Sequence, residues 1–373
     1  MIERTVGNRI REHLGDRKAI VLKGARQVGK TTLLRQLLSG KKVLWINGDK
    51  ISDRALWDEV DPRRLQFLLE GYDYVVIDEA QRVANIGLTT KLIIDEEYGV
   101  QPILSGSSSL NLASTLSEPL TGRKWSFELY PISWSELRAY RGNYEALQQL
   151  EERLIVGSYP EVVTAKTAVV TRLEEIASSY LYKDILDYGL VRKPELIERL
   201  LRAVAYQVGG EVSYNELANM LQVSYETVRR YLQLLEESYV IFRLDPLSTN
   251  PRKEISTSRK IYFIDNGIRN AVINNFDPLH LRDDRGALWE NYVVSEFLKQ
   301  QRNTGQRSKV YYWRSKGGAE VDLVVQEGER YRAYEIKYNP KKKPRFPAAF
   351  VERYGPGVTE VVNRENFYRV FGE

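Results

Sequence analysis

The sequence predicts a chain of the α/β class that begins with a mainly parallel sheet and continues through helical and mixed regions. Between residues 18 and 132, short apolar runs alternate with helical stretches, as they do when a helix links each parallel strand to the next. Beyond residue 132 the apolar spacing becomes helical and later mixed. Because 373 residues exceed one core of ordinary size, we expect several domains.

We divide the chain into four regions. Residues 1–132 are expected to form the parallel-sheet domain, and 133–210 a helical connector or lid. Residues 211–260 are expected to form a helix-turn-helix region, and 261–373 a second α/β domain. The expected strands of the first domain are Ala19 to Leu22, Val43 to Ile46, Tyr74 to Ile77, Pro102 to Leu104 and Trp125 to Leu129.

Composition restricts the sites that the chain can build. With no cysteine and only two histidines, disulfides, cysteine zinc sites and histidine-rich metal sites are excluded, so any metal must be held by oxygen. The net charge of +5 favours a polyanionic partner such as DNA, but it equally suits a soluble protein without one. The sequence shows no signal-peptide pattern and no run of roughly 18 apolar residues, so we expect a cytoplasmic protein without a membrane partner.

A phosphate-binding segment follows the first apolar run. The sequence GARQVGKT from Gly24 has the P-loop pattern of two glycines, a lysine and a hydroxyl residue, and it precedes a helical stretch. Inward N–H groups and the positive end of a helix bind phosphates, which predicts ATP as a ligand. We expect Lys30 to neutralise the β- and γ-phosphate oxygens and Thr31 to bind Mg²⁺. The expected nucleotide contacts are Gly24, Ala25, Arg26, Gln27, Val28, Gly29, Lys30, Thr31 and Thr32.

The apolar run from Tyr74 ends in two carboxylates, a form typical of a Walker B element. We expect Asp78 to hold Mg²⁺ through water and Glu79 to orient and polarise the attacking water. The run at Val43 to Ile46 lies between the P-loop and this element, which favours the P-loop ATPases with an inserted strand and an adjacent catalytic glutamate. The alternative is a pair of acids that simply faces solvent.

Two further groups are candidates for contact with the γ-phosphate. Ser105 and Ser107 follow the next apolar run and are suited to sense it, unless they belong to a serine-rich loop without contact. Arg123 follows Gly122 and would stabilise the transferring group in the same or a neighbouring subunit, which makes a homo-oligomer possible. An ordinary surface arginine is the alternative.

Residues 211–244 have the pattern of a helix, a tight turn, a second helix and a strand, which resembles a winged helix over 211–260. Ser213 with Glu216 predicts a capping box, and Ser224 is placed to cap the second helix. This second helix would contact a DNA groove or its phosphates, or else the module mediates domain or subunit contacts. The expected DNA contacts are Tyr225, Thr227, Arg229 and Arg230, with Arg252, Lys253, Arg259 and Lys260 in the wing.

Two strands near the C-terminus carry acidic side chains. A two-residue turn at Gly328 and Glu329 pairs Asp322 with Glu335, and Glu320 with Lys337, on one face of a hairpin. Neighbouring carboxylates repel each other unless a cation or a proton lies between them. This pairing therefore predicts Mg²⁺ or a raised pKa.

Several segments resemble archaeal and bacterial AAA-type ATPases with an appended C-terminal region. They are GARQVGKTTLL from Gly24, YVVIDEAQRV from Tyr74, LTGRKWSFELYPISWSEL from Leu120, GSYPEVV from Gly157 and YYWRSKGGAEVDLVV from Tyr311. The likeness covers nearly the whole chain. It implies ATP binding in an AAA-like P-loop domain and a C-terminal half with a winged helix and a restriction-endonuclease-like fold over 261–373.

The C-terminal acids also resemble the PD-(D/E)xK nuclease arrangement. By that resemblance Glu290, Asp322 and Glu335 would bind metal, and Lys337 would position water. No proline precedes Asp322 in the usual form, and acid–lysine pairs are common on sheet faces. Three functions stay open: a DNA-associated ATPase whose ATP binding controls the C-terminal half, an ATP-gated binding or regulatory protein with an inactive nuclease fold, and an ATP-controlled metal-dependent DNA nuclease.

Overall fold

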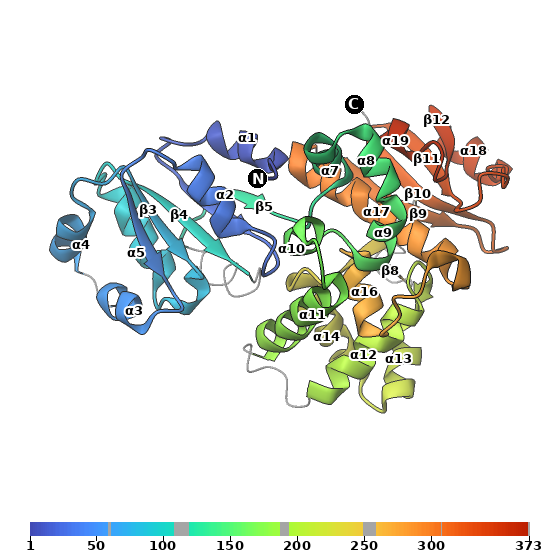
Figure 1. Cartoon of the computed structure of the whole chain (residues 1–373), viewed down its shortest axis with the longest axis horizontal. Helices are drawn as coiled ribbons and strands as arrows, with labels where there is room; N and C mark the ends of the chain where they lie inside the picture. The colour runs from blue at the N-terminus through green and yellow to red at the C-terminus, as the bar shows by residue number, and fades with distance from the viewer. Residues whose placement is uncertain (59–60, 108–118, 187–193, 249–258, 307, 372–373) are drawn as a thin grey trace. The chain divides into compact units, whose positions relative to one another are not determined.

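The computed structural model describes residues 1–58, 61–107, 119–186, 194–248, 259–306 and 308–371 (Figure 1). The chain forms two compact units. The first comprises residues 1–130 with the short segments 237–239 and 302–304, and the second comprises the rest. The first boundary therefore falls close to the one expected at residue 132, whereas the boundaries expected at 211 and 261 lie within the second unit.

In the described part of the first unit, five strands form a sheet in which all neighbours pair in parallel. The strands are β1 (Ala19–Lys23), β2 (Val43–Asn47), β3 (Tyr74–Asp78), β4 (Gln101–Gly106) and β5 (Lys124–Glu128). The five expected strands are confirmed, with ends that differ by up to two residues. Since parallel strands need a crossover, helices link β1 to β2, β2 to β3 and β3 to β4.

The order of this sheet corrects one expectation. Its strands run β2-β3-β4-β1-β5, so β4 is the strand inserted between β1 and β3. The run at Val43 to Ile46 instead lies in β2 at the edge of the sheet. Position along the chain does not fix position in a sheet, because a crossover can carry the next strand past its neighbour.

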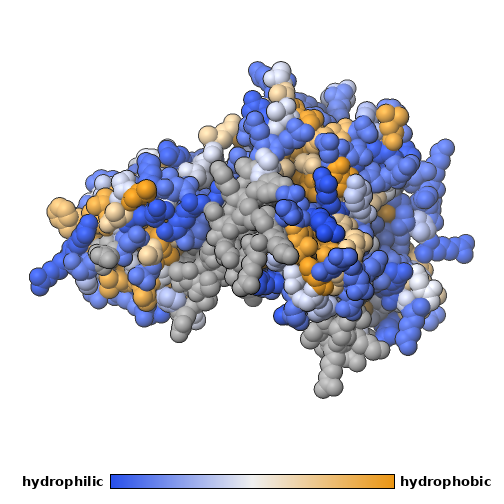
Figure 2. Space-filling view, turned by 90° about the horizontal axis from the view of Figure 1, so that it is seen from below, coloured by the Kyte–Doolittle hydropathy of each residue, from blue (hydrophilic) through white to orange (hydrophobic). Residues whose placement is uncertain are grey.

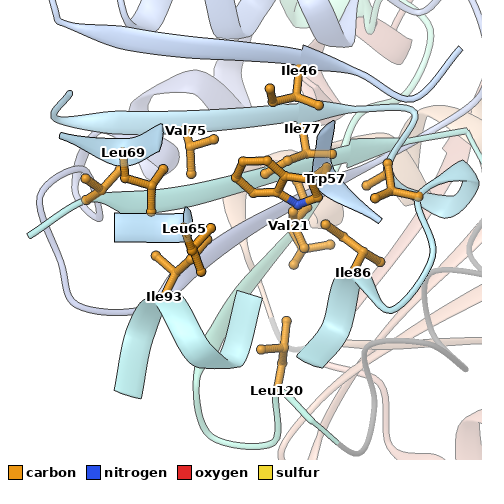
Figure 3. Packing of buried hydrophobic residues seen from close by; sticks show 14 residues of the cluster. Val21, Ile46, Trp57, Leu65, Leu69, Val75, Ile77, Ile86, Ile93 and Leu120 are labelled. Atoms are coloured by element: carbon orange, nitrogen blue, oxygen red, sulfur yellow. The ribbon is translucent and has the colours of Figure 1, made fainter. Parts of the chain in front are cut away.

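Helices bury the sheet of the first unit. They are α1 (Thr5–Arg11), α2 (Lys30–Leu37), α3 (Ile51–Trp57), α4 (Pro62–Leu69), the 3₁₀ helix η1 (Ala80–Arg82) and α5 (Ile86–Asp95). Figure 3 shows Trp57 of α3 and Leu65 of α4 packed with Val21 and Ile77 of the sheet. All of β3 from Tyr74 to Ile77 is buried, as expected for a parallel strand covered on both faces.

A larger sheet lies in the second unit. Its described strands are β6 (Glu211–Val212), β7 (Ile241–Pro246), β8 (Arg259–Phe263), β9 (Lys309–Arg314), β10 (Glu320–Glu327), β11 (Arg330–Ile336) and β12 (Val358–Val362). They run in the order β12-β11-β10-β9-β7-β8-β6. The strands of the helix-turn-helix region therefore share a sheet with those of the C-terminal region, through the parallel pairing of Asp245 with Tyr311.

Much of the second unit outside this sheet is helical, and it includes the helix-turn-helix region (Figure 1). The described helices are α7 (Trp134–Arg141), α8 (Asn143–Gln148), α9 (Leu150–Val156), α10 (Pro160–Thr164), α11 (Val169–Leu186), α12 (Pro194–Tyr206), α13 (Tyr214–Leu221), α14 (Tyr225–Glu237), α16 (Asn266–Val272), η2 (Leu279–Leu281), α17 (Arg285–Thr304), α18 (Ala348–Tyr354) and α19 (Phe367–Val370). Ser133 and Glu136 form a capping box that begins α7, where the helical region was expected to start.

The hairpin β10–β11 has the predicted register. Glu327 pairs with Arg330 across the turn, and Leu323 pairs with Tyr334 further along.

Polar side chains cover most of the molecular face in Figure 2, apart from the residues drawn in grey. Among the described helices, none combines the length and apolar character needed to cross a lipid bilayer.

Candidate functional site

The P-loop connects the carboxyl end of β1 to the beginning of α2, and glycine is required at its turns. A Cβ at Gly24 would lie 2.2 Å from the carbonyl oxygen of Leu129, so a larger residue would not fit. Gly29 precedes α2 with φ of 95°, a left-handed conformation that glycine adopts without steric cost. Gln27 also has a positive φ, of 59°. The local sequence thus fixes a tight loop in front of a helix N-terminus.

Lys30 lies inside this loop. Its side chain is only 6% exposed, and its Nζ donates to the carbonyl oxygens of Gly24 and Ala25, each at 2.8 Å. The loop backbone therefore holds an ammonium group beside the helix N-terminus. Both features attract an anion.

Thr31, Asp78 and Ser105 meet where α2 begins and where β3 and β4 end. The Oγ1 of Thr31 donates to Oδ2 of Asp78 at 2.7 Å, and the Oγ of Ser105 donates to Oδ1 of the same carboxylate. Carboxylate and hydroxyl oxygens are ligands that Mg²⁺ accepts. Thr31 and Asp78 therefore fit the magnesium site expected from the sequence.

Glu79 lies beside these residues in a second polar group. The Nε2 of Gln81 donates to Oε2 of Glu79 at 2.6 Å and to Oγ of Ser107 at 3.3 Å, and that Oγ is 3.4 Å from the same oxygen of Glu79. Glu79 has φ of 49°, and a Cβ at Gly48 would lie 2.4 Å from the Glu79 carbonyl oxygen. Of the two expected serines, Ser105 contacts Asp78 and Ser107 contacts Glu79.

Two residues of this site were missed by sequence reasoning. Arg4 is 6% exposed, and it donates from Nη1 to the carbonyl oxygen of Val28 at 2.8 Å and from Nη2 to that of Tyr130. No pattern in the sequence marks Arg4, because it lies far upstream of the loop that it supports. Gln81, in contrast, stands two positions after Glu79 within a segment already recognised.

Arg123 does not take the position expected of it within its own subunit. It precedes β5, where its carbonyl oxygen accepts from the backbone N of Ala19, and its Nε pairs with Asp95 at 2.7 Å. Since β1 and β5 are parallel, Arg123 lies at the end of the sheet where β1 begins, about 15 Å from the P-loop at roughly 3.3 Å per strand residue. The expectation of a contact in the same subunit is therefore wrong. A contact with a neighbouring subunit stays a prediction.

In the second unit, the hairpin brings together three of the expected acidic-site residues. Asp322 and Glu335 are buried, at 6% and 5% exposure. The Nζ of Lys337 lies 2.6 Å from Oδ2 of Asp322 and 2.8 Å from Oε2 of Glu335, so one ammonium bridges both carboxylates. Burial, reinforced by the charge of Asp322, raises the pKa of Glu335 to about 7. A raised pKa is one of the two outcomes that the sequence predicts for this pair, the other being Mg²⁺.

Glu290, the fourth expected residue, is bound by a second lysine. Lys260 of β8 is 2% exposed, and its Nζ pairs with Oε1 of Glu290 at 3.0 Å and with Glu320. The hydroxyl of Tyr262 also donates to Glu290, at 2.8 Å. Burial raises the pKa of Glu290, whereas the adjacent Lys260 lowers it and the charge of Asp322 raises it further.

The position of Lys260 corrects its assignment to a DNA-contacting wing, because a buried ammonium cannot reach a DNA backbone. Arg259 is partly exposed, and its Nε pairs with Asp245 at 2.6 Å. Arg252 and Lys253, also assigned to the wing, lie outside the described residues.

The acidic group does not fit a divalent metal in this arrangement. Lys260 and Lys337 each bridge two carboxylates, and together they supply the charge that a divalent ion would supply. Among the side chains that the structure describes, no set of three or more acidic or histidine residues is placed to hold a metal. The metal-binding role expected of Glu290, Asp322 and Glu335 is therefore not supported by their geometry.

The helix-turn-helix region begins its helices at the predicted residues, but of the capping box expected at Ser213 and Glu216 the described contacts include only the bond accepted by Ser213. The Oγ of Ser213 accepts from the backbone N of Glu216 at 3.3 Å, and the Oγ of Ser224 accepts from that of Thr227 at 3.2 Å. On α14, Tyr225, Arg229 and Arg230 are exposed and Thr227 is half-buried. Glu226 pairs with Arg229 at 3.0 Å, which offsets part of the positive charge on this face.

Comparison with known sequences finds three family matches along the chain. The family described as an AAA domain matches residues 16–138, and two domains of unknown function match 147–279 and 285–369. An uncharacterized protein of Mycobacterium tuberculosis is 30% identical over 342 residues, covering 90% of this chain and 73% of the relative. An uncharacterized protein of Methanocaldococcus jannaschii is 24% identical over 344 residues, covering 86% of this chain and 75% of the relative.

Among solved structures, the Walker-type ATPase of Pyrococcus abyssi has a similar fold. It matches with a TM-score of 0.50 and 16% identity, covering 73% of this chain and 96% of that one. At this identity the likeness concerns the fold alone.

Proposed function

This chain belongs to the same protein family as its Mycobacterium tuberculosis relative and is an ATPase with an AAA domain; on that premise we propose that it binds ATP with Mg²⁺ at the P-loop and hydrolyses it there. One observation carries the proposal. Thr31, in the first turn of the phosphate-binding helix α2, and Asp78, at the end of β3, hold their oxygens 2.7 Å apart, and the buried Lys30 adjoins Thr31 in the chain.

Each residue has a distinct part in this reaction. Lys30 exchanges its two carbonyl partners for phosphate oxygens, and the loop N–H groups orient the triphosphate. Thr31 and Asp78 would hold Mg²⁺, which would supply neutralising charge to the triphosphate. Glu79 orients the attacking water and accepts its proton. Ser105 contacts Asp78 and Ser107 contacts Glu79, and both serines sense whether the γ-phosphate is present.

Steady-state ATPase rates and binding of a fluorescent ATP analogue test this assignment. We expect Lys30→Ala to lose binding, and Glu79→Gln to keep binding while kcat falls by about 10²-fold or more. Lys41→Ala, which removes an exposed lysine from the same unit, is the matched control. Normal hydrolysis by Glu79→Gln would refute the role of Glu79. Normal binding by Lys30→Ala would refute the P-loop assignment.

We further propose that the second unit associates with DNA and that ATP binding controls this association. Support comes from the net charge of +5 of the whole chain and from the exposed Tyr225, Arg229 and Arg230 on the second helix of a helix-turn-helix. The proposed control of DNA association by ATP binding is motivated by the order of the domains along the chain. Binding of labelled duplex DNA, measured by anisotropy with and without a non-hydrolysable ATP analogue, tests both parts.

The DNA experiment needs a matched arginine control. Replacing Arg229 and Arg230 with alanine should weaken binding about tenfold and reduce its salt dependence, whereas Arg369→Ala, an exposed arginine of α19, should not. If both variants bind alike, α14 is not the contact surface. If affinity is the same with and without nucleotide, the ATP control is refuted.

A second candidate function is an ATP-gated binding or regulatory protein with an inactive nuclease fold. The two lysine bridges favour it over an ATP-controlled nuclease, because they occupy the carboxylates that a metal would need. We expect no plasmid cleavage in Mg²⁺ or Mn²⁺. Cleavage that is lost in both Asp322→Ala and Lys337→Ala would instead establish the nuclease, whereas cleavage that persists in both would come from a contaminant or another site.

A further inference from the structure

The side-chain amide of Gln81 forms hydrogen bonds through its nitrogen, Nε2, but not through its oxygen, Oε1, among the described residues. It lies in η1, two residues after Glu79, and its Nε2 donates to Glu79 and Ser107. An ionised carboxylate only accepts hydrogen bonds, so the amide nitrogen must face Glu79. This requirement fixes the orientation of the amide and turns its oxygen, Oε1, away from the Glu79 contact.

Oε1 is a buried acceptor without a donor. It has no hydrogen-bond partner among the residues that the structure describes. Most buried polar atoms in folded proteins are hydrogen-bonded, and an unsatisfied one is costly unless a water or ligand completes it. Because the same amide group contacts Glu79 and Ser107, a donor that completed Oε1 would lie next to the Glu79 and Ser107 group.

We propose that Gln81 is a second ligand of the attacking water. Oε1 accepts one hydrogen of this water, Glu79 accepts the other, and Nε2 holds the Glu79 carboxylate in place. Two acceptors fix both the position of the water and the direction of its lone pair, whereas Glu79 alone leaves the water free to rotate. This inference rests on the proposed ATP hydrolysis and adds a catalytic residue to it.

The reaction is a hydrolysis of the bond between the β- and γ-phosphates. The water oxygen forms a bond to the γ-phosphorus, and the bond from this phosphorus to the β,γ-bridging oxygen breaks. ADP leaves with the electron pair of that bond. The proton lost by the water passes to Glu79, while Gln81 remains neutral and exchanges no proton. Gln81 therefore acts only by position, which predicts an effect on kcat without one on ATP binding.

The test replaces Gln81 with methionine, which keeps the length of the side chain and removes both polar atoms. We expect kcat to fall about 10²-fold while the KM for ATP changes less than about threefold. Gln36→Met, which changes an exposed glutamine of α2, is the matched control. Gln81→Asn keeps the amide but withdraws it by one methylene, so an intermediate kcat is expected.

Two phosphate analogues separate a role in the reaction from a structural role. ADP with aluminium fluoride mimics the transferring phosphate with its attacking water, whereas ADP with beryllium fluoride mimics bound ATP. We expect Gln81→Met to lose affinity for the first by about tenfold or more and to keep affinity for the second. The thermal midpoint should match that of wild type. If Gln81→Met does not fold, Gln81→Asn tests the inference instead: its kcat should fall while its KM for ATP stays close to that of wild type.

Two results would overturn the inference: a wild-type kcat in the folded variant, or an equal loss of affinity for both analogues. Failure of the proposed function looks different. In that case wild type itself binds no ATP, or Glu79→Gln hydrolyses ATP at the wild-type rate.

Discussion

Replacing Lys260 with methionine should destabilise the second unit strongly. Methionine is close to lysine in length, so the change removes the ammonium with little loss of packing. The ammonium is 2% exposed and bridges Glu290 and Glu320. Breaking a buried ion pair by removing one partner typically costs about 3–5 kcal/mol. Because Tyr262 still donates to Glu290 and Glu320 is 28% exposed, we expect the lower end, about 3 kcal/mol.

Urea unfolding followed by circular dichroism measures this change. A loss of about 3 kcal/mol corresponds to a midpoint lower by about 1 M. The deficit should shrink as the pH falls, because burial already raises the pKa of Glu290, and a protonated carboxyl needs no counter-ion. Lys341→Met, at an exposed lysine of the same unit, is the control and should change the free energy of unfolding by less than about 0.5 kcal/mol.

Divalent cations give this variant a second readout. With Lys260 absent, the carboxylates of Glu290 and Glu320 lack their bridging charge, so Mn²⁺ should stabilise the variant more than wild type. A loss below about 1 kcal/mol would refute the reasoning on the buried ion pair. Equal stabilisation of wild type and variant by Mn²⁺ would refute the inference that an ammonium occupies the position of a metal.

Three further predictions concern other parts of the chain. Arg4→Met should weaken binding of an ATP analogue about tenfold, because the Val28 carbonyl loses its support; unchanged affinity would exclude this role. Gly24→Ala should abolish ATPase activity and lower the free energy of unfolding by about 2 kcal/mol or more, since its Cβ would overlap the Leu129 carbonyl; normal stability and turnover would contradict the close approach. Glu335 has a pKa raised to about 7, so ionising it opposes folding: wild type should lose stability relative to Glu335→Gln as the pH rises from about 4.5 to above 7. Parallel pH curves for these two proteins would refute that prediction.

The sequence predicts the nucleotide site well because its chemistry depends on short, contiguous segments. The glycines near Lys30 are required by the local backbone, and the apolar run before Asp78 identifies a buried strand. Parallel strands place their carboxyl ends at one edge, so Asp78 and Ser105 were expected near Thr31. The same local reasoning gave the hairpin register that aligns Asp322 with Glu335.

Other features depend on contacts between residues far apart in the chain. Arg4 supports the P-loop across 24 positions, and the burial of Lys260 depends on carboxylates 30 and 60 positions away. The insertion of β4 between β1 and β3 likewise follows from a crossover, and it leaves Arg123 at the end of the sheet away from the P-loop. None of these partners is encoded by spacing or by the type of the residue itself.

The sequence by itself thus determined the P-loop, the acidic strand end that completes it, the parallel sheet and the helix starts at Ser213 and Ser224. Only the tertiary structure decided which cations meet which carboxylates, and whether a charged side chain faces solvent or is buried. The physical reason is that backbone conformation is constrained by a few adjacent residues, whereas the charge and burial of a side chain depend on every segment that packs around it.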